Sequence, residues 1–252
     1  MKEVMKEVMK EVMKEVTKIG VSMQFASWRV DIFTRWASVF AVLTTVTALM
    51  MAAFPASAKE STNIRERVMV FGDSLSAAYG INVNDGWVSL MAAKLKPQGI
   101  AVVNASVSGE TTRGGLARIK TDLARLSPTI LVLALGANDG LRGLPNADTQ
   151  KNLEAIINAA RGASARVVLV GIQIPPNYGL EYAQRFRAMY ADLAAKYKLP
   201  LVPFLLEGIA DKLELFQTDR LHPTAAAQPQ ILANVTPAVW EAIAKTSAAQ
   251  RR

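Results

Sequence analysis

Cysteine is absent from this 252-residue chain, and histidine occurs once, at His222. Without cysteine the chain cannot form a disulfide, bind a metal through thiolates or use a cysteine nucleophile. It also lacks the cysteine at which bacterial lipoproteins are processed. A single histidine without cysteine does not supply the usual zinc ligands, so we expect no metal site.

Several ligand-binding and catalytic motifs are missing as well. Neither G-x-G-x-x-G nor G-x-x-x-x-G-K-[ST] occurs, so dinucleotide and nucleoside triphosphate binding lose their usual support. We therefore expect no cofactor. Position 76 is serine, so the chain has no G-x-S-x-G nucleophile turn of the α/β-hydrolase type.

Charge and composition describe a globular protein with a basic balance. The chain is 51% hydrophobic and 20% charged, with a formal net charge of +8. Beyond residue 58 the basic residues are scattered, and no run of them alternates with aromatic residues. This pattern gives little support to nucleic-acid binding, and we expect no nucleic-acid partner.

The first 58 residues have the features of a leader. Residues 1–16 repeat MKEV four times; we expect no folded role for residues 1–35, and Met23 is an alternative start. Residues 36–58 contain an apolar stretch after two arginines and end in Ala56-Ser57-Ala58, which is typical of a secretory signal peptide cut after Ala58. An uncleaved membrane anchor is the alternative, since the apolar stretch is just long enough to span a bilayer.

The remainder, residues 59–252, is expected to be one domain. After cleavage it should be periplasmic or secreted, without a stable membrane span, and monomeric. Short apolar runs alternate with amphipathic runs, which predicts a parallel sheet with helices on both faces. We expect strands at 68–71, 100–103, 130–135, 167–172 and 201–204, and helices at 87–96, 111–126, 149–160, 182–197 and 223–244.

In such folds the functional site lies beyond the carboxyl ends of the strands. That rule points to the loops at 72–76, 104–112, 136–144 and 173–178. Gly72 allows a sharp turn after the first strand, which would bring Ser74 to the edge of the sheet. The alternative is an ordinary turn, because glycine, aspartate and serine are favoured there.

Asp219 precedes His222 by three residues, a spacing that can bring the two side chains together. A carboxylate on one ring nitrogen fixes the histidine tautomer, and the other nitrogen can then take a proton from a serine. We expect Ser74 to be the nucleophile and His222 the general base. A lone histidine is more often structural or merely exposed, so this interpretation depends on the conjunction of motifs.

Two further loops offer hydrogen-bond donors for an oxyanion. Gly109 precedes a predicted helix, where its N–H has no helical partner, and Asn138 has a side-chain amide. With the N–H of Ser74, these donors would form an oxyanion hole. Alternatively, Ser108 or Thr111 caps the helix, and Asn138 is a turn residue in the left-handed conformation.

These motifs resemble those of the SGNH (GDSL) hydrolase superfamily. The resemblance rests on Gly72-Asp73-Ser74-Leu75, on Gly109, on Gly136-Ala137-Asn138-Asp139 and on Asp219-Arg220-Leu221-His222. The resemblance extends over residues 66–245. Within the superfamily, this part of the chain is similar to the bacterial periplasmic arylesterase, acyl-CoA thioesterase I and lysophospholipase L1 group. Two departures are Ala137, where relatives often have glycine, and Glu110, where they often have aspartate.

The resemblance implies a flavodoxin-like three-layer α/β/α sandwich with a five-stranded parallel sheet in the order 2-1-3-4-5. It implies that Asp219 orients His222, and that the chain cleaves a small-molecule acyl ester or thioester through an acyl-enzyme intermediate. The loop at 140–144 and the stretch at 174–178 would help to shape an acyl groove. Candidate substrate-binding residues are Leu75, Leu141, Leu144, Ile174, Pro175 and Tyr178.

Three alternatives remain open at this point. Each groove residue can instead be part of the ordinary core. A carbohydrate O-deacetylase of the same superfamily would need a polar, aromatic-lined cleft, which the apolar loops disfavour. A lipid- or glycan-binding protein without activity could keep the same fold.

Overall fold

The computed structural model describes residues 3, 6–7, 10–11, 14 and 66–249. The described residues of the MKEV repeat are helical and exposed, and they belong to a unit, Met1–Ser61, separate from Thr62–Arg252. The predicted signal peptide at 36–58, its cleavage site and the start of the mature domain lie outside the described residues. In the part that is described, no helix is long and apolar enough to cross a membrane.

A five-stranded sheet forms the centre of residues 66–249, and all its neighbouring strands run parallel. The strand order is β2-β1-β3-β4-β5, as the resemblance implied. Parallel pairing follows from the helix that lies between each strand and the next. The strands are β1 (Glu66–Gly72), β2 (Ile100–Asn104), β3 (Ile130–Ala134), β4 (Arg166–Val170) and β5 (Leu201–Val202).

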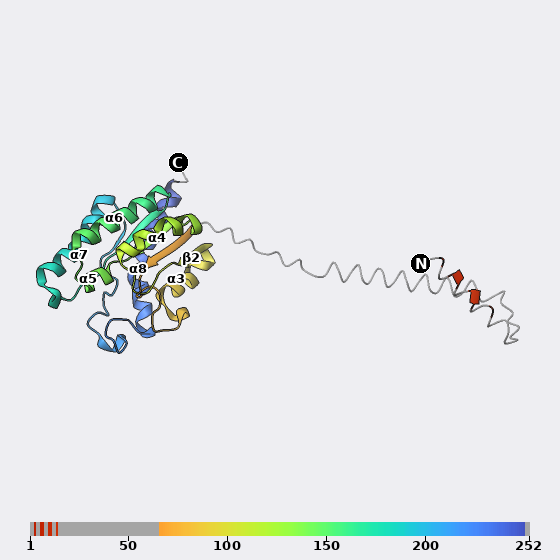
Figure 1. Cartoon of the computed structure of the whole chain (residues 1–252), viewed down its shortest axis with the longest axis horizontal. Helices are drawn as coiled ribbons and strands as arrows, with labels where there is room; N and C mark the ends of the chain where they lie inside the picture. Colours follow the sequence, from red (N-terminus) through yellow and green to blue (C-terminus); the bar gives the residue numbers. More distant parts are fainter. Residues whose placement is uncertain (1–2, 4–5, 8–9, 12–13, 15–65, 250–252) are drawn as a thin grey trace. The chain divides into compact units, whose positions relative to one another are not determined.

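Helices cover both faces of the sheet, so the domain is the expected three-layer sandwich. Helices α4 (Thr112–Leu126), α6 (Asn146–Gly162) and α7 (Leu180–Tyr197) pack side by side on one face (Figure 1). Helices α3 (Trp87–Leu95) and α8 (Gln228–Ala249) pack together on the other. The shorter elements are α5 (Ala137–Leu141), η1 (Val83–Asp85), η2 (Lys96–Gln98), η3 (Pro176–Tyr178), η4 (Leu213–Leu215) and η5 (Ala225–Ala227).

The core lies in two layers, between the sheet and each set of helices. Strand β3 is the middle strand, and all five of its residues are buried. A strand covered on both faces reads as an unbroken apolar run, which is why ILVLA shows no alternation. Phe71, Trp87, Phe186 and Tyr190 are the largest aromatic side chains in this core.

The predicted elements are correct in kind and order, with three corrections. The loop expected at 136–144 contains the short helix α5, which brings Asn138 into its first turn. The last helix begins at Gln228, because Pro223 pairs with Phe216 in an isolated antiparallel bridge. Strand β5 has two residues, because the chain leaves the sheet after Val202.

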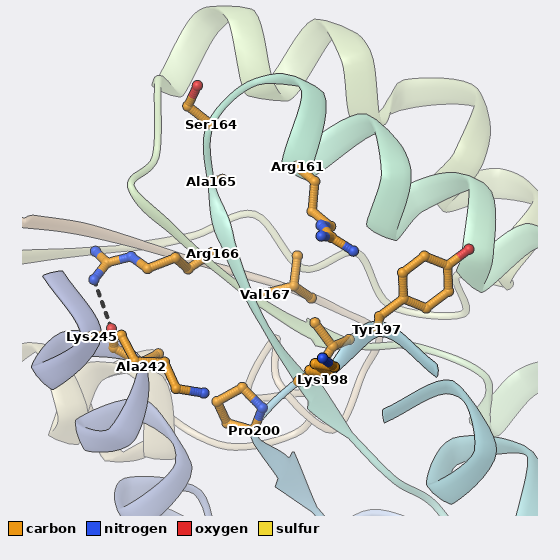
Figure 2. A pocket seen from close by; sticks show the side chains of 11 residues that line it. Arg161, Ser164, Ala165, Arg166, Val167, Tyr197, Lys198, Pro200, Ala242 and Lys245 are labelled. Atoms are coloured by element: carbon orange, nitrogen blue, oxygen red, sulfur yellow. Dashed lines mark hydrogen bonds between the residues drawn. The ribbon is translucent and has the colours of Figure 1, made fainter. Parts of the chain in front are cut away.

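A buried ion pair ties together the edge of the sheet where the strands begin. Arg166, at the start of β4, donates to the Glu66 carboxylate at 2.6 Å. It also donates to the carbonyl of Ala242 in α8 at 2.7 Å (Figure 2). The hydroxyl of Thr129 also donates to Glu66. The Glu66 side chain is 7% exposed, so its charge depends on these partners rather than on water.

A cavity of about 260 Å³ lies beside this ion pair, between the ends of α6, α7 and α8 (Figure 2). Its cationic side chains are Arg161, Arg166, Lys198 and Lys245. Arg161 lies in the last turn of α6 and Lys198 is the C-cap of α7, where positive charge is favoured by the helix dipole. We therefore attribute this basic cluster to helix termination and to the ion pair.

We expect Arg166→Met to lower the free energy of unfolding by about 3–5 kcal/mol, because it leaves the buried Glu66 carboxylate without its cation. The matched control is Arg185→Met. It removes one partner of the exposed Arg185–Glu181 pair and should cost less than about 1 kcal/mol. Urea unfolding of both variants checks the difference. Equal losses would contradict a structural role for the buried pair.

Candidate active site

The turn after β1 presents Ser74 at the carboxyl end of the sheet. The carbonyl of Asp73 accepts the N–H groups of Ser76 at 3.1 Å and Ala77 at 3.0 Å, which closes the turn. A Cβ on Gly72 would lie 2.9 Å from the carbonyl of Ala134, so glycine is required for β1 to approach β3 here. The turn leaves the Ser74 side chain partly exposed.

His222 and Asp219 reach this serine from the other end of the chain. The Nε2 atom of His222 lies 2.9 Å from Ser74 Oγ, and its Nδ1 atom lies 2.6 Å from Asp219 Oδ2. The other carboxylate oxygen of Asp219 accepts the N–H groups of Leu221 and His222. The three side chains therefore form one continuous chain of hydrogen bonds from carboxylate to hydroxyl.

The carboxylate of Asp219 is held in its charged form. The backbone N–H of His222, the His222 ring and the backbone N–H of Leu221 donate to it and lower its pKa from 3.8 to about 2. Asp219 is therefore ionised at neutral pH. A permanent negative charge on the Nδ1 side of His222 favours the tautomer in which Nε2 is free to accept a proton.

Tyr79 and Gln217 support His222, and the sequence motifs did not single out either residue. The ring of Tyr79 lies 4.4 Å from that of His222, centroid to centroid. Gln217 donates its side-chain amide to the carbonyl of Tyr79 at 2.8 Å and its backbone N–H to the carbonyl of His222 at 2.8 Å. Tyr79 belongs to the turn that carries Ser74, so these contacts link that turn to the loop that carries His222.

The predicted oxyanion donors lie in the neighbouring loops. Gly109 has a φ of 77°, and nothing lies within 4 Å of the position where a Cβ would be, so it is the backbone conformation that favours glycine. Among residues 66–249, the N–H groups of Gly109 and Ser74 make no hydrogen bond. Both N–H groups are thus available to a substrate oxygen.

The side-chain amide of Asn138 is oriented by one of its two hydrogens. It donates to the carbonyl of Glu110 at 3.0 Å, which leaves the second hydrogen for another acceptor. The carboxylate of the next residue, Asp139, accepts a hydrogen bond from the N–H of Thr112 at 2.8 Å and another from the Thr112 hydroxyl at 2.5 Å. These bonds connect α5 to the beginning of α4, so the loops carrying Asn138 and Gly109 are held together.

Asp73, next to the nucleophile, has the opposite electrostatic environment to Asp219. Burial disfavours its charge and raises its pKa from 3.8 to about 7, and the carboxylates of Asp139 and Glu110 add to this effect. The N–H of Leu75 donates to Asp73 Oδ1 at 3.0 Å and partly opposes the rise in pKa. At slightly acidic pH the Asp73 side chain is therefore a neutral carboxylic acid.

An apolar cavity of about 440 Å³ opens beside Ser74. Four of the predicted groove residues line it: Leu75, Leu141, Ile174 and Pro175. Leu144 and Tyr178 are not among the residues that line it, and their substrate-binding role remains a prediction. The wall also contains residues that the sequence reasoning missed, namely Ala137, Ile172, Gln173, Phe204, Leu206, Ala210, Phe216, Arg220 and Leu221.

Most of the missed wall residues come from the segment between β5 and η5. Apolar residues in an irregular segment have no periodic pattern, so their sequence does not reveal which of them face a cavity. Within the described part of the chain, no group of three or more histidine, cysteine, aspartate or glutamate residues is placed to hold a metal ion.

Known proteins resemble the segment that carries this site. The model of the GDSL-like Lipase/Acylhydrolase family matches residues 70–228, from β1 to the beginning of α8. The chain is 47% identical over 174 residues to Esterase TesA of Pseudomonas aeruginosa, covering 68% of this chain and 87% of the relative. It is 37% identical over 183 residues to Thioesterase 1/protease 1/lysophospholipase L1 of Escherichia coli strain K12, covering 73% and 85%.

A solved structure agrees with these sequence relatives. The crystal structure of TesA matches with a TM-score of 0.68 and 45% identity, over 70% of this chain and 99% of the other. The family match includes Ser74, Gly109, Asn138, Asp219 and His222, so it covers the hydrogen-bond chain and the predicted oxyanion donors. The chain therefore belongs to the GDSL-like lipase/acylhydrolase family.

Proposed function

We propose that this protein is a serine hydrolase that cleaves carboxylic esters and thioesters through an acyl-enzyme intermediate. One observation carries the proposal. Ser74 Oγ lies 2.9 Å from His222 Nε2, which is within the range for direct proton transfer between a nucleophile and its base. The relatives from P. aeruginosa and E. coli are named as an esterase and as a thioesterase and lysophospholipase, which supports the same chemistry.

In the first half-reaction, His222 Nε2 takes the proton of Ser74 as Oγ forms a bond to the carbonyl carbon. The carbonyl π electrons move to oxygen, and the resulting oxyanion accepts hydrogen bonds from the N–H groups of Ser74 and Gly109 and from the amide of Asn138. Asp219 stabilises the imidazolium that forms at His222. The N–H groups of Ser74 and Gly109 make no hydrogen bond among the described residues, so none has to break when the oxyanion forms.

Collapse of the tetrahedral intermediate breaks the bond to the leaving group, which takes its proton from His222. An alcohol leaves an ester, and a thiol leaves a thioester. Water then enters, gives a proton to His222 and attacks the acyl carbon. The second collapse releases the acid and returns the proton to Ser74.

The cavity supports an acyl chain as the part of the substrate that is bound. Its wall is built mainly from aliphatic residues with Phe204 and Phe216. Contact between these side chains and an acyl chain is favourable, because it removes apolar surface from water. A carbohydrate O-deacetylase would instead need polar groups to pair with sugar hydroxyls. The complete hydrogen-bond chain at Ser74 disfavours a binding protein without activity.

Export and processing remain predictions from the sequence. The signal peptide at 36–58 and the cut after Ala58 would place the enzyme in the periplasm or outside the cell. Mass spectrometry of the exported protein would detect an N-terminus at Lys59. Retention of residues 36–58 would favour the membrane-anchor alternative.

We expect Ser74→Ala to lower kcat on p-nitrophenyl esters by at least about 10³-fold, because the nucleophile is lost while the fold is kept. Ser76→Ala is the matched control. The Ser76 hydroxyl lies in the same turn and is buried without a hydrogen-bond partner among the described residues, so its removal should leave turnover within about twofold. Unchanged turnover in Ser74→Ala would contradict the assignment of the nucleophile.

We expect Asp219→Asn to lower kcat near neutral pH by about 10³–10⁴-fold. The amide would donate to His222 Nδ1 and place the ring proton on Nε2, where it blocks proton transfer from Ser74. Nuclear magnetic resonance of the single histidine would report the change of tautomer. Asp192→Asn, on the exposed surface of α7, is the control and should keep the kcat of the unchanged protein. An unchanged kcat in Asp219→Asn would contradict the proposed role of Asp219.

We expect Asp73→Asn to change how stability depends on pH. Between pH 4 and pH 7 Asp73 is ionised in the unfolded chain but protonated in the fold, so unfolding releases a proton and rising pH favours unfolding. The variant lacks this proton release. Its free energy of unfolding, relative to the unchanged protein, should therefore rise from about pH 4 to about pH 7 and then level off.

Urea unfolding at half-unit steps of pH tests this expectation. Asp192→Asn again serves as the control, because its carboxylate is exposed. A stability difference for Asp73→Asn that does not vary with pH would show that Asp73 is ionised in the fold.

A further inference from the structure

The apolar cavity beside Ser74 has one cationic side chain, Arg220, among the described residues that line it. No aspartate or glutamate of the described residues lines the cavity, so no carboxylate there offsets that charge. Arg220 is exposed at the cavity and lies in the loop between Asp219 and His222. Its position thus combines a positive charge, an apolar wall and the catalytic histidine.

The Arg220 guanidinium has no partner among residues 66–249. Within residues 66–249, no hydrogen-bond acceptor or carboxylate pairs with its side chain, whereas Arg118, Arg125, Arg166 and Arg185 each pair with an acid. The adjacent Asp219 is directed to His222 and to two backbone N–H groups instead. All the donors of the Arg220 guanidinium are therefore available to a ligand.

The backbone of Arg220 is unusual for a residue with a side chain. Its φ is 56°, in the left-handed region that favours glycine or asparagine, and its N–H donates to the carbonyl of Gln217 at 2.9 Å. The turn would form more readily with glycine, so the fold does not require arginine here. Ala78, Ser127, Ser164 and Lys198 share this conformation, so it shows that the turn does not need arginine and does not by itself mark a site.

The proposed reaction fixes the direction in which the leaving group lies. The leaving oxygen takes its proton from His222, so the part of the substrate beyond that oxygen extends past the loop that carries Arg220. A planar guanidinium can bind a phosphate with two parallel hydrogen bonds. We propose that Arg220 forms a subsite for a phosphate that lies a few bonds beyond the scissile ester, as in a lysophospholipid; the subsite rests on the proposed function.

Distance separates this class of substrate from acyl-coenzyme A. In an acyl glycerophosphate about five bonds, or about 6 Å, join the ester oxygen to phosphorus, at about 1.2 Å per bond of extended chain. In acyl-coenzyme A about a dozen bonds, or about 15 Å, separate the thioester sulfur from the first phosphate. Arg220 lines the same cavity as Ser74 and His222, which fits the shorter distance.

The test uses Arg220→Gln, which shortens the side chain only slightly and removes its charge. We expect the ratio of kcat/KM for 1-octanoylglycerol 3-phosphate to that for 1-octanoylglycerol to fall about tenfold, the loss of a charge-assisted hydrogen bond. Arg220→Lys, which keeps the charge, should restore most of the ratio. Added salt should lower the ratio in the unchanged protein but not in Arg220→Gln.

Two controls separate the possible outcomes. Arg187→Gln removes an equal charge on α7, on a different cavity, and should leave the ratio unchanged. Octanoyl-coenzyme A compared with octanoyl-N-acetylcysteamine tests the distant phosphate, and this ratio should change much less in Arg220→Gln. The subsite is overturned if Arg220→Gln leaves the glycerophosphate ratio unchanged, or if the coenzyme A ratio falls by as much.

Hydrolysis of 1-octanoylglycerol by the unchanged protein distinguishes failure of the subsite from failure of the proposed function. If that neutral ester is cleaved and the ratio does not respond to Arg220→Gln, the subsite alone is wrong. If the unchanged protein cleaves none of the four substrates, the proposed hydrolase function is wrong, and the subsite with it.

Discussion

The hydrogen bond between Ser74 and His222 is the contact on which the site depends. It joins residues 148 positions apart at a distance of 2.9 Å. A parallel sheet makes this possible, because each strand ends at the same edge and delivers its following loop there. Ser74 follows β1, while His222 arrives in the segment between β5 and α8. Four of the five strands therefore lie between the two residues in sequence, and the sheet brings the residues together in space.

The pKa values of two aspartates beside this contact are shifted in opposite directions for identifiable reasons. Asp219 is partly exposed and accepts three hydrogen bonds, so its pKa falls to about 2. Asp73 is buried next to other carboxylates, so its pKa rises to about 7. The first charge faces the imidazole, where a developing positive charge needs it. Suppression of the second charge would reduce the negative charge close to the proposed site of the oxyanion.

In the proposed function, the cavity adds substrate recognition to this electrostatic arrangement. Its apolar wall favours an acyl chain, while the one cation on it, within the described residues, lies in the histidine loop. An acyl chain and a polar leaving group make opposite demands on their surroundings. Placing Arg220 near His222, rather than deeper along the apolar wall, would let one cavity meet both demands.

The sequence was informative about the chemistry because its signals are local. Gly72 and Ser74 after an apolar run, and Asp219 three residues before His222, can be read from a few consecutive residues. The alternation of strands and helices then predicted which loops share one edge of the sheet. The strand order came from the family resemblance, since periodicity does not reveal which strands are neighbours.

Other features depend on contacts between distant segments, and the local sequence pattern does not predict them. Helix α5 forms around Asn138 although asparagine and glycine are weak helix formers. The ring of Tyr79 lies tilted against that of His222, and Phe204 and Phe216 reach the cavity, because the turn that carries Ser74 and the segment after β5 fold against each other. Side-chain direction in irregular segments is set by packing across the whole domain, so the conformational propensities of neighbouring residues do not predict it.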